Sequence, residues 1–314
     1  MPTLYKIGPA WFRRAIIERV PSKAVKQLLS IVDIQHQQAL QIFEQKKATL
    51  ARGISKEDSA KTEKDVIMLM LQANEKASVE DKISEAEMIG QINTLIFAGH
   101  DTASGTIACV LQMLAENPQV QTELRDELLK SSADEPDYAT LEASTLLDAV
   151  IKETLRLHPP VPVVERVSTR DVVLPLRAST KGKHPTTELT VPAGTLVMLS
   201  LRAANRDPAT WGNDSLEWNP YRWLGPLPAE VADARVPGVY SNIMSFLGGP
   251  YSCIAYKFAL LEAKVVVAAL VRRFYLSPGD RAVVWKFGGT SKPFVVDPVS
   301  GHSSPGLVLK LALA

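Results

Sequence analysis

The chain has 314 residues, of which 46% are hydrophobic and 22% are charged, so it can bury a large globular core. Its formal net charge of +1 and its lack of a Lys/Arg block argue against direct binding of DNA or RNA. Cys109 and Cys253 fall in different predicted helices, which favours a reducing compartment over a disulfide framework. No signal-peptide core and no apolar run of about 18 residues is present, so the sequence predicts no transmembrane segment.

Residues 1–80 show helical periodicity interrupted by polar segments. We expect a helix over about 22–51, a shorter one over 65–74 and a charged linker over 75–81. The apolar stripe that opens the region is Trp11, Phe12, Ile16, Ile17 and Val20. Plain helical packing is the simplest interpretation of this region.

A long helix is predicted over 84–116. Ser84 and Glu87 have the spacing of a capping box, in which each side chain bonds the other residue's backbone N–H. The helix would be roughly 50 Å long at 1.5 Å per residue. The Asn117-Pro118 pair ends it and starts the next helix.

The middle of this helix carries unusual residues for a helix interior. Gly99 and Gly105 each cost about 1 kcal/mol relative to alanine, which predicts the close approach of something flat or bulky. Asp101 and Thr102 add a carboxylate and a hydroxyl to an otherwise apolar span. The simpler alternative is that Asp101 faces solvent and the glycines only let another helix cross.

A further helix is predicted over 145–158, where Pro159-Pro160 stops it. Glu153 and Arg156 are three residues apart and therefore lie on one face within pairing distance. On spacing alone, a surface ion pair is the simplest interpretation. Short strands separated by turns follow over 161–200, and His184 is expected to be solvated at a loop tip.

A glycine-rich loop over 245–255 delivers Cys253 to the start of an apolar helix that extends to Phe274. Unpaired amides and the helix dipole favour a thiolate at such a position, and Gly248 and Gly249 allow the loop to turn. A thiolate nucleophile would need a nearby base, and zinc would need further ligands, whereas haem iron needs one. A buried apolar cysteine is the alternative for any single cysteine. Hairpins and a last strand over 307–313 complete the chain.

Three motifs together resemble those of the cytochromes P-450. Phe246, Gly249 and Cys253 match the family's haem-binding pattern F-x-x-G-x-R-x-C-x-G in register. Residues 98–102 match its A/G-G-x-D/E-T signature, and 153–156 match its E-x-x-R pair. The resemblance covers essentially the whole chain in the family's order.

Two departures and two further matches qualify the resemblance. Tyr251 stands where the family has an arginine that pairs with a haem propionate, and Ala255 replaces the last glycine of the motif. Arg166 lies where the family often places another propionate-binding arginine, so it becomes the main candidate for that role. Arg222 matches the arginine that joins the family's buried E-x-x-R pair, although Tyr221 replaces the neighbouring glutamate.

The resemblance implies a mainly α fold with small β-sheets (α+β) in a single domain over 1–314. Within it, the resemblance assigns roof-type helices to 1–80, the central helix to 84–116, the E-x-x-R helix to 145–158, a β region to 161–200 and the haem-binding loop and helix to 245–274. The family's membrane anchor and early helices have no counterpart here, so the chain is expected to be a truncated or alternatively started form.

The implied activity is that of a haem-thiolate monooxygenase of fungal type, with Cys253 as the iron ligand. Asp101 and Thr102 would deliver protons for oxygen activation. The haem would be contacted by Phe246, Gly249, Ala98, Gly99 and Arg166, and the fold would be held by Glu153, Arg156 and Arg222.

The implied partners are O2, an NADPH-dependent reductase as the electron donor, and a small apolar organic substrate of secondary metabolism. The full-length family member would sit at the cytosolic face of the endoplasmic reticulum membrane. Two alternatives remain open: a haem-deficient remnant that binds partners without catalysis, and a haem protein with peroxygenase or isomerase chemistry.

Overall fold

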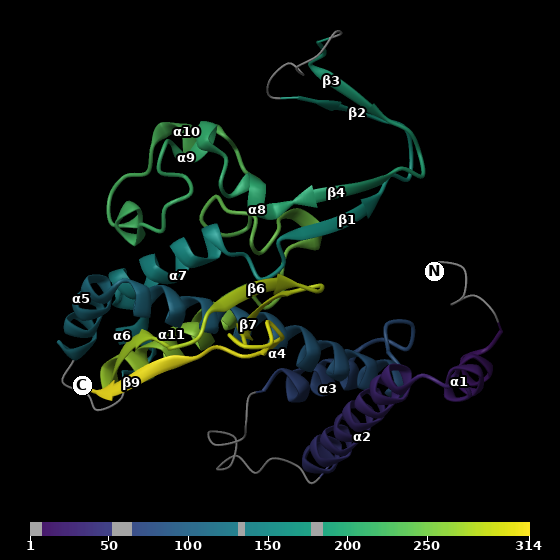
Figure 1. Ribbon diagram of the computed structural model, residues 1–314. Helices are drawn as coiled ribbons and strands as arrows, with labels where there is room; N and C mark the ends of the chain where they lie inside the picture. Colours follow the sequence, from purple (N-terminus) through teal and green to yellow (C-terminus); the bar gives the residue numbers. More distant parts are fainter. Residues whose placement is uncertain (1–7, 52–64, 131–135, 177–184) are drawn as a thin grey trace. The chain divides into compact units, whose positions relative to one another are not determined.

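A computed structural model describes residues 8–51, 65–130, 136–176 and 185–314 (Figure 1). These residues are mainly helical, with small antiparallel sheets of two or three strands. The prediction of a mainly α fold with small sheets is therefore confirmed. The remaining parts of the predicted 1–80 and 161–200 regions, His184 included, lie outside the described residues.

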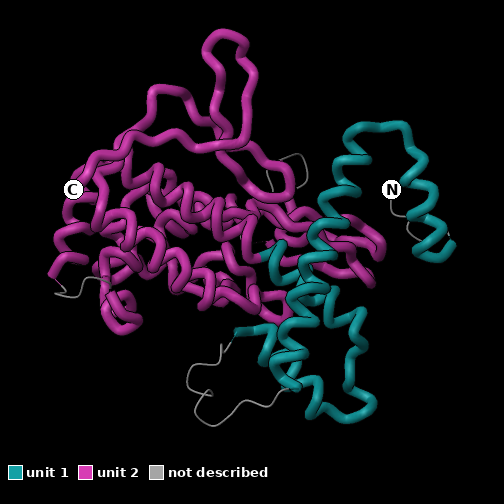
Figure 2. The backbone as a smooth tube through the Cα atoms, turned by 90° about the horizontal axis from the view of Figure 1, so that it is seen from below, with its two compact units in different colours: residues 1–98 teal, residues 99–314 magenta. Residues whose placement is uncertain are grey.

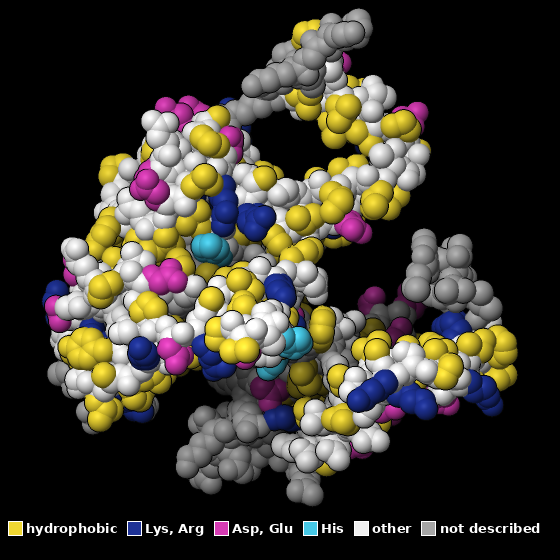
Figure 3. Space-filling view, viewed as in Figure 1, with side chains coloured by type: hydrophobic (Ala, Val, Ile, Leu, Met, Phe, Trp, Pro, Cys, Tyr) yellow, Lys and Arg dark blue, Asp and Glu magenta, His cyan; other side chains and the backbone are white. Residues whose placement is uncertain are grey.

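The chain divides into two compact units, residues 1–98 and 99–314 (Figure 2). The first unit holds α1 (Ala10–Glu18), α2 (Lys23–Ala51), α3 (Val66–Lys76) and the first part of α4 (Glu85–Glu116). Helices α2 and α3 match the predicted helices over 22–51 and 65–74. The core of this unit is formed by Ala39, Phe43, Leu71, Met88, Ile89 and Ile92. Apolar side chains also remain exposed over α1 and α2, as the yellow atoms in Figure 3 show.

The start of α4 has the predicted capping box. The backbone N–H of Ser84 donates to the carboxylate of Glu87 at 2.8 Å, and the N–H of Glu87 donates to the Ser84 hydroxyl at 3.3 Å. These bonds satisfy two of the N–H groups that a helix start leaves unpaired. The helix ends at Glu116, and Pro118 opens α5 (Pro118–Leu129).

The core of the second unit lies among the C-terminal half of α4, α5, α7 (Thr145–Leu157) and α11 (Tyr256–Arg273). Its fully buried members include Val110, Leu114, Leu124, Leu147, Ile151, Val267 and Val271. Helix α7 is buried on nearly every face, because ten of its thirteen residues are buried. The helix with the E-x-x-R pair therefore runs through the interior, and the helix after Cys253 packs in the same core as α4.

Two buried cations tie these helices together. Arg125 of α5 donates from Nε to the carbonyl of Val271 at 2.8 Å and stacks 3.7 Å from the ring centroid of Tyr275. Lys264 of α11 pairs with Glu142 of α6 (Tyr138–Ala143) at 2.9 Å and with Asp148 of α7 at 3.3 Å. Because both side chains are buried, these bonds fix how α11 lies against its neighbours.

The strands form four antiparallel ladders or sheets within the described residues. Strand β1 (Val163–Val167) pairs with β4 (Leu196–Ser200), and β2 (Val172–Pro175) pairs with β3 (Glu188–Val191). These two ladders follow one another along a protruding arm (Figure 1). The remaining strands are β5 (Phe274–Pro278) with β9 (Leu309–Leu313), and β6 (Val283–Phe287) with β7 (Ser291–Val296) and β8 (Ser303–Pro305).

Short helices connect β4 to α11. They are α8 (Leu201–Ala204), α9 (Pro208–Trp211), the 3₁₀ helix η3 (Pro220–Trp223), α10 (Ala229–Asp233) and the 3₁₀ helix η4 (Gly249–Tyr251). Among these elements, η3 packs closely against α7. This connection therefore covers the buried helix and ends at the Cys253 loop.

Candidate functional site

Cys253 lies on a tightly hydrogen-bonded loop between η4 and α11. Its backbone N–H donates to the carbonyl of Phe246 at 2.9 Å, and Ser252 N–H donates to the carbonyl of Gly249 at 3.1 Å. The first residue of α11 is Tyr256, so the cysteine lies three residues ahead of the helix rather than within its first turn. The loop bonds, more than the helix itself, fix the position of the sulfur.

Two glycines of this loop are required by its geometry. A Cβ on Gly248 would come within 1.5 Å of the carbonyl oxygen of Pro237, which no side chain permits. Gly249 has a φ of +64°, a left-handed conformation that glycine adopts without strain. The glycine pattern therefore reflects close backbone packing at one position and a turn at the next.

Phe246 supports the loop through aromatic contacts. Its ring lies 5.8 Å from that of Tyr240 and 6.0 Å from that of Tyr256, measured between centroids. Such tilted and edge-on pairs stabilise the position of each ring beyond simple burial. Phe246 thus joins the loop to Tyr240 and to the start of α11, and it also packs against the core of the second unit.

The two cysteines have contrasting environments. Cys253 is partly exposed, whereas Cys109 on α4 is only 1% exposed, and neither is in a disulfide. Burial raises the pKa of the Cys109 thiol to about 12, with a further contribution from Glu116. Cys109 therefore behaves as a small apolar residue, and Cys253 is the accessible thiol of the pair.

Thiol labelling should separate the two cysteines. In folded protein free of haem, we expect iodoacetamide to modify Cys253 quickly and Cys109 only very slowly, because only a solvent-accessible thiolate reacts. Peptide mass spectrometry after timed labelling measures both rates, and labelling in urea provides the control in which both react. Equal rates in the folded protein would contradict the structure.

A cation lies beside the cysteine loop. The guanidinium carbon of Arg166, on β1, is 4.8 Å from the centroid of the Tyr251 ring. Arg166 also donates to the carbonyl of Glu165 at 2.8 Å, and Tyr251 is 70% exposed. Contact with an aromatic face holds a guanidinium without neutralising it. Strand β1 thus brings a positive charge into contact with Tyr251, which lies two residues before Cys253 in the loop.

The Asp101 carboxylate on α4 is paired with the β6–β7 hairpin. Its Oδ1 lies 2.6 Å from Nζ of Lys292, and its Oδ2 accepts a hydrogen bond from the Thr290 hydroxyl. Partial burial by itself would raise the pKa of Asp101, but the bonds from Lys292 and Thr290 outweigh it, and the pKa is lowered. Asp101 is therefore ionised at neutral pH.

The neighbouring residues of the predicted motif lie on the same helix. Thr102 is half-buried, and its carbonyl accepts a hydrogen bond from the Thr106 hydroxyl at 2.9 Å. Gly99 is exposed, and a Cβ there would meet nothing within 4 Å. Ala98, also exposed, is the last residue of the first unit. At Gly105, by contrast, a Cβ would lie 3.0 Å from the carbonyl oxygen of Ser291. The absence of a side chain at Gly105 therefore allows β7 to approach α4.

Glu153 and Arg156 form a fully buried ion pair on α7. The two carboxylate oxygens lie 2.8 and 2.9 Å from Nη2 and Nε of Arg156, and both side chains are 0% exposed. Arg222 of η3 joins the pair with its Nε 3.0 Å from the Glu153 carboxylate. The surface ion pair that spacing alone favours is therefore wrong, because α7 lies in the interior.

The chain matches the family model named "Cytochrome P450" over residues 6–299. The chain belongs to the cytochrome P-450 family. It is 42% identical to cytochrome P-450 monooxygenase 212 of Postia placenta, over 99% of this chain and 57% of that protein. It is 44% identical to monooxygenase 91 of the same fungus, over 94% of this chain and 55% of that protein.

A third relative of the cytochrome P-450 family has a more specific name. The ganoderic acid synthetase of Ganoderma lucidum is 38% identical over 93% of this chain and 55% of its own length. The chain thus spans little more than half the length of these relatives. Among the described residues, no helix is both long enough and apolar enough to cross a membrane.

The residues around Cys253 suit the haem that cytochromes P-450 bind. The set comprises one accessible thiol, a guanidinium from Arg166 within reach of the loop, and exposed apolar side chains that follow the cysteine along the chain. Ile254 is 94% exposed and Phe258 is 62% exposed. Haem needs an axial ligand, apolar contacts for its ring and a cation for its carboxylates, so the donor set fits the group.

Sequence reasoning missed several partners of the motif residues. The Glu153 carboxylate also accepts from Nε1 of Trp223 at 2.9 Å and from the N–H of Asn219 at 3.0 Å. Lys292 and Thr290 were not expected next to Asp101. The aromatic and charged residues around Arg222 were visible in the sequence as a motif. In contrast, nothing in the local sequence of β7 indicates that Lys292 pairs with Asp101 of α4.

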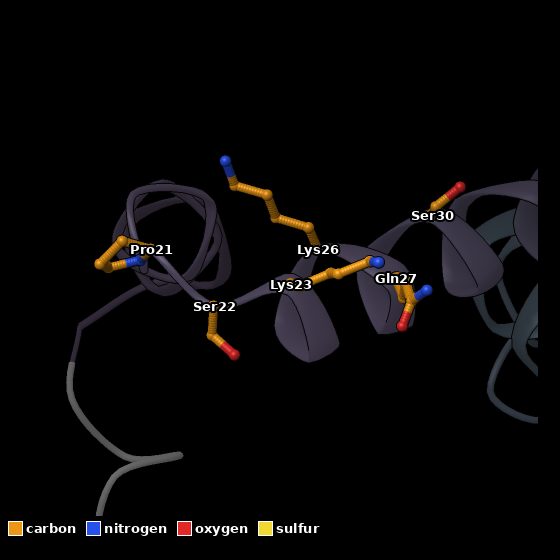
Figure 4. Close-up of a pocket in the computed structure, with 6 residues that line it drawn as sticks. All are labelled: Pro21, Ser22, Lys23, Lys26, Gln27 and Ser30. Carbon is orange, nitrogen blue, oxygen red and sulfur yellow. The ribbon is translucent and has the colours of Figure 1, made fainter.

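Cys253 lines neither of two pockets formed by the described residues. The larger, about 460 Å³, is lined by residues of the α1–α2 connection and the first turns of α2, whose side chains point in different directions in Figure 4. It presents lysines, serines and a glutamine but no group of the motifs. The smaller, about 170 Å³, lies among Gly105, His158, Pro160 and the β6–β7 hairpin. Burial lowers the pKa of His158 to about 4, and nearby arginines contribute, so that imidazole is neutral.

Proposed function

We propose that the chain is the haem-binding part of a haem-thiolate monooxygenase that hydroxylates an apolar organic molecule. The observation that carries this proposal is the partly exposed Cys253 on its constrained loop, with Arg166 stacked on Tyr251 beside it. A single thiol with an adjacent cation suits haem better than it suits a metal that needs several protein ligands. Bound through Cys253, haem would supply the activation of O2.

Each residue near the loop has a role in this proposal. Cys253 would be the axial iron ligand, and the backbone turn at Gly249 would let the ring approach the loop. Phe246 would keep the loop in place through its contacts with Tyr240 and Tyr256. Arg166 would pair with a haem propionate. It would take the role of the loop arginine of the family, whose position is occupied by Tyr251 in this chain.

Residues of α4 would supply the opposite side of the site and the protons. Ala98 and Gly99 would offer a surface without bulky side chains to the ring. Asp101 would take a proton from solvent and pass it to the Thr102 hydroxyl, which would donate its own proton onward. Both side chains would then return to their starting states, so the pair could deliver a second proton.

The proposed partners follow from the family. Electrons would come from an NADPH-dependent reductase, and the whole protein would work at the cytosolic face of the endoplasmic reticulum membrane. The ganoderic acid synthetase among the relatives supports a place in secondary metabolism. We therefore propose a small, largely apolar secondary metabolite as the substrate class.

A carbon-monoxide difference spectrum tests the proposal. Reduced protein loaded with haem should show the Soret band of a thiolate-ligated haem, and with reductase, NADPH and O2 it should convert an apolar test substrate to a hydroxylated product. Tyr251 in place of the family's arginine favours one competing function, a partner-binding protein without haem. Absence of the thiolate band under saturating haem would support that function instead.

Replacing Arg166 by alanine should weaken haem binding and leave the fold intact. The guanidinium of Arg166 is the cation that contacts Tyr251 of the loop. A hydrogen bond between a charged group and a carboxylate contributes about 1.5–3 kcal/mol, or roughly 10- to 150-fold in affinity. Titration of the haem-free protein with haem measures the affinity.

Two matched variants complete this test. Arg166→Lys keeps the charge and should recover part of the affinity. Arg170→Ala removes an exposed arginine of the same β region and should have no effect. Unchanged haem affinity in Arg166→Ala would remove Arg166 from the site.

A further inference from the structure

The β6–β7 hairpin is attached to one face of α4 at three points. Asp101 binds the hairpin turn, Gly105 lies against the carbonyl of Ser291, and Gln112 accepts from Nε1 of Trp285 at 2.8 Å. These α4 positions are separated by four and seven residues, which places them along one side of a helix with 3.6 residues per turn. The hairpin therefore covers a continuous stripe of α4.

The hairpin turn itself is held in a defined position. Gly289 has a φ of +94°, which the tight turn requires, and the N–H of Gly288 donates to the carbonyl of Thr290 at 3.2 Å. The N–H of Ser291 donates to the carbonyl of Pro160, at the exit of α7, at 2.8 Å. The turn is thus also bonded to the segment that follows α7, and this bond fixes the base from which its side chains meet Asp101.

Lys292 and Thr290 both reach the Asp101 carboxylate from this base. The lysine ammonium binds one oxygen and the threonine hydroxyl binds the other. The side chains of Asp101 and Lys292 are 20% and 45% exposed, so water has access to the pair. A carboxylate bonded at both oxygens by two groups of one hairpin has a set orientation.

We propose that Lys292 is a positioning residue of the proton pathway, which together with Thr290 fixes the Asp101 carboxylate against the β6–β7 hairpin. This inference rests on the proposed function, in which Asp101 supplies protons to Thr102. Thr102 is one residue further along α4 and so lies roughly 100° around the helix axis from Asp101. The hairpin therefore determines that the carboxylate receives its proton on the side of α4 that faces the hairpin. To pass the proton on, the carboxylate has to turn around the helix axis toward the Thr102 hydroxyl.

The charges that act on Asp101 support this role. Lys292 from β7 and His100 from α4 both favour the ionised carboxylate. Lys286, the cross-strand neighbour of Lys292, directs its ammonium to the Ser303 hydroxyl instead. Because Lys292 lowers the pKa of Asp101, its removal should raise that pKa, and the carboxylate should then become protonated at higher pH than in the wild-type protein.

The first measurement needs no haem chemistry. A double-mutant cycle with Lys292→Met and Asp101→Asn, read out by urea unfolding, should show a stabilising coupling at pH 7. The coupling should disappear as the pH falls through the pKa of Asp101 in the folded protein, since a protonated carboxyl no longer attracts the ammonium. Absence of coupling at pH 7 would overturn the proposal.

The second measurement is the pH dependence of product formed per O2 consumed by the haem-loaded protein with its reductase. Lys292→Met should move the acidic limb of this profile to higher pH, and Lys292→Arg should leave it near the wild-type position. Lys286→Met removes the same charge from the same hairpin and should not shift the limb. A limb that stays unchanged in Lys292→Met would show that the ion pair is only structural.

Thr102→Ala separates the failure of this inference from that of the proposed function. It should lower the product formed per O2 at every pH without moving the acidic limb, because the hydroxyl is lost while Asp101 keeps its partners. If wild-type protein loaded with haem forms no product, the proposed function fails and the positioning role fails with it. The coupling measured by the cycle would then describe a structural ion pair.

Discussion

Replacing Glu153 by alanine is expected to lower the free energy of unfolding by about 3–5 kcal/mol, because it leaves a buried guanidinium without its counter-charge. Arg156 is 0% exposed, so water cannot solvate the orphaned charge. The backbone carbonyls of Asn205 and Ser215 also bind Arg156, at 3.0 and 2.6 Å, but they carry no compensating negative charge.

The same carboxylate connects three parts of the second unit. Its two oxygens accept from Arg156 on α7, from Arg222 and Trp223 on η3, and from the N–H of Asn219. Arg222 in turn pairs with Asp214 at 2.8 Å. The loss of Glu153 should therefore loosen η3 from α7 as well as destabilise the core.

The pH dependence of this contribution follows from the pKa of Glu153. Burial would raise that pKa, but the bonds and charge of Arg156, with Asn219 and Arg222, outweigh it, and the pKa is lowered. A lowered folded-state pKa means that the stabilisation is fully present above the unfolded-state pKa, about 4.3. It is lost as the pH falls through the folded-state pKa.

Urea unfolding at pH 7 measures the effect. Glu153→Gln keeps the shape and some hydrogen bonds but removes the charge, so it should still be clearly destabilising. Glu116→Ala removes an exposed carboxylate at the end of α4 and should change stability by less than about 0.5 kcal/mol. A Glu153→Ala protein as stable as the Glu116→Ala control would show that the buried cluster does not hold the fold.

Replacing Cys253 by serine should abolish the Soret band of thiolate-ligated haem and all product formation. A serine hydroxyl stays protonated at neutral pH and does not offer iron the anionic sulfur that the proposed chemistry needs. The fold should persist, because Cys253 is partly exposed and the loop bond at this position uses its backbone N–H. Haem titration, the carbon-monoxide difference spectrum and urea unfolding test these three points together.

Cys109→Ala is the matched control for Cys253→Ser. Cys109 is buried on α4 and its replacement leaves the loop unchanged, so the spectrum should remain that of the wild-type protein with at most a modest loss of stability. If the thiolate band survives in Cys253→Ser, or disappears in Cys109→Ala, the assignment of Cys253 as the iron ligand is wrong.

The sequence alone was sufficient for features that depend on neighbours along the chain. The capping box of Ser84 and Glu87, the boundaries of α4 and α7, and the turn at Gly249 all follow from residues a few positions apart. The family, and with it the mainly α fold, was evident from the motifs around Cys253, Asp101 and Glu153. In each case the interacting groups are brought together by one turn of helix or loop.

The tertiary structure decided what lies against these groups. Spacing put Glu153 and Arg156 together, but only the packing of α7 among α5, α11 and η3 made the pair buried. Gly105 is explained by the backbone of Ser291, 186 positions away, which no local pattern encodes.

The partners of the candidate site were likewise decided by packing. Arg166 meets Tyr251 because β1 runs beside the cysteine loop, and Lys292 meets Asp101 because the hairpin is fixed to α4 and to Pro160. Local sequence determines helices and turns because their bonds join near neighbours. Contacts between distant segments depend on how whole elements bury their apolar faces, and that is settled only when the chain packs.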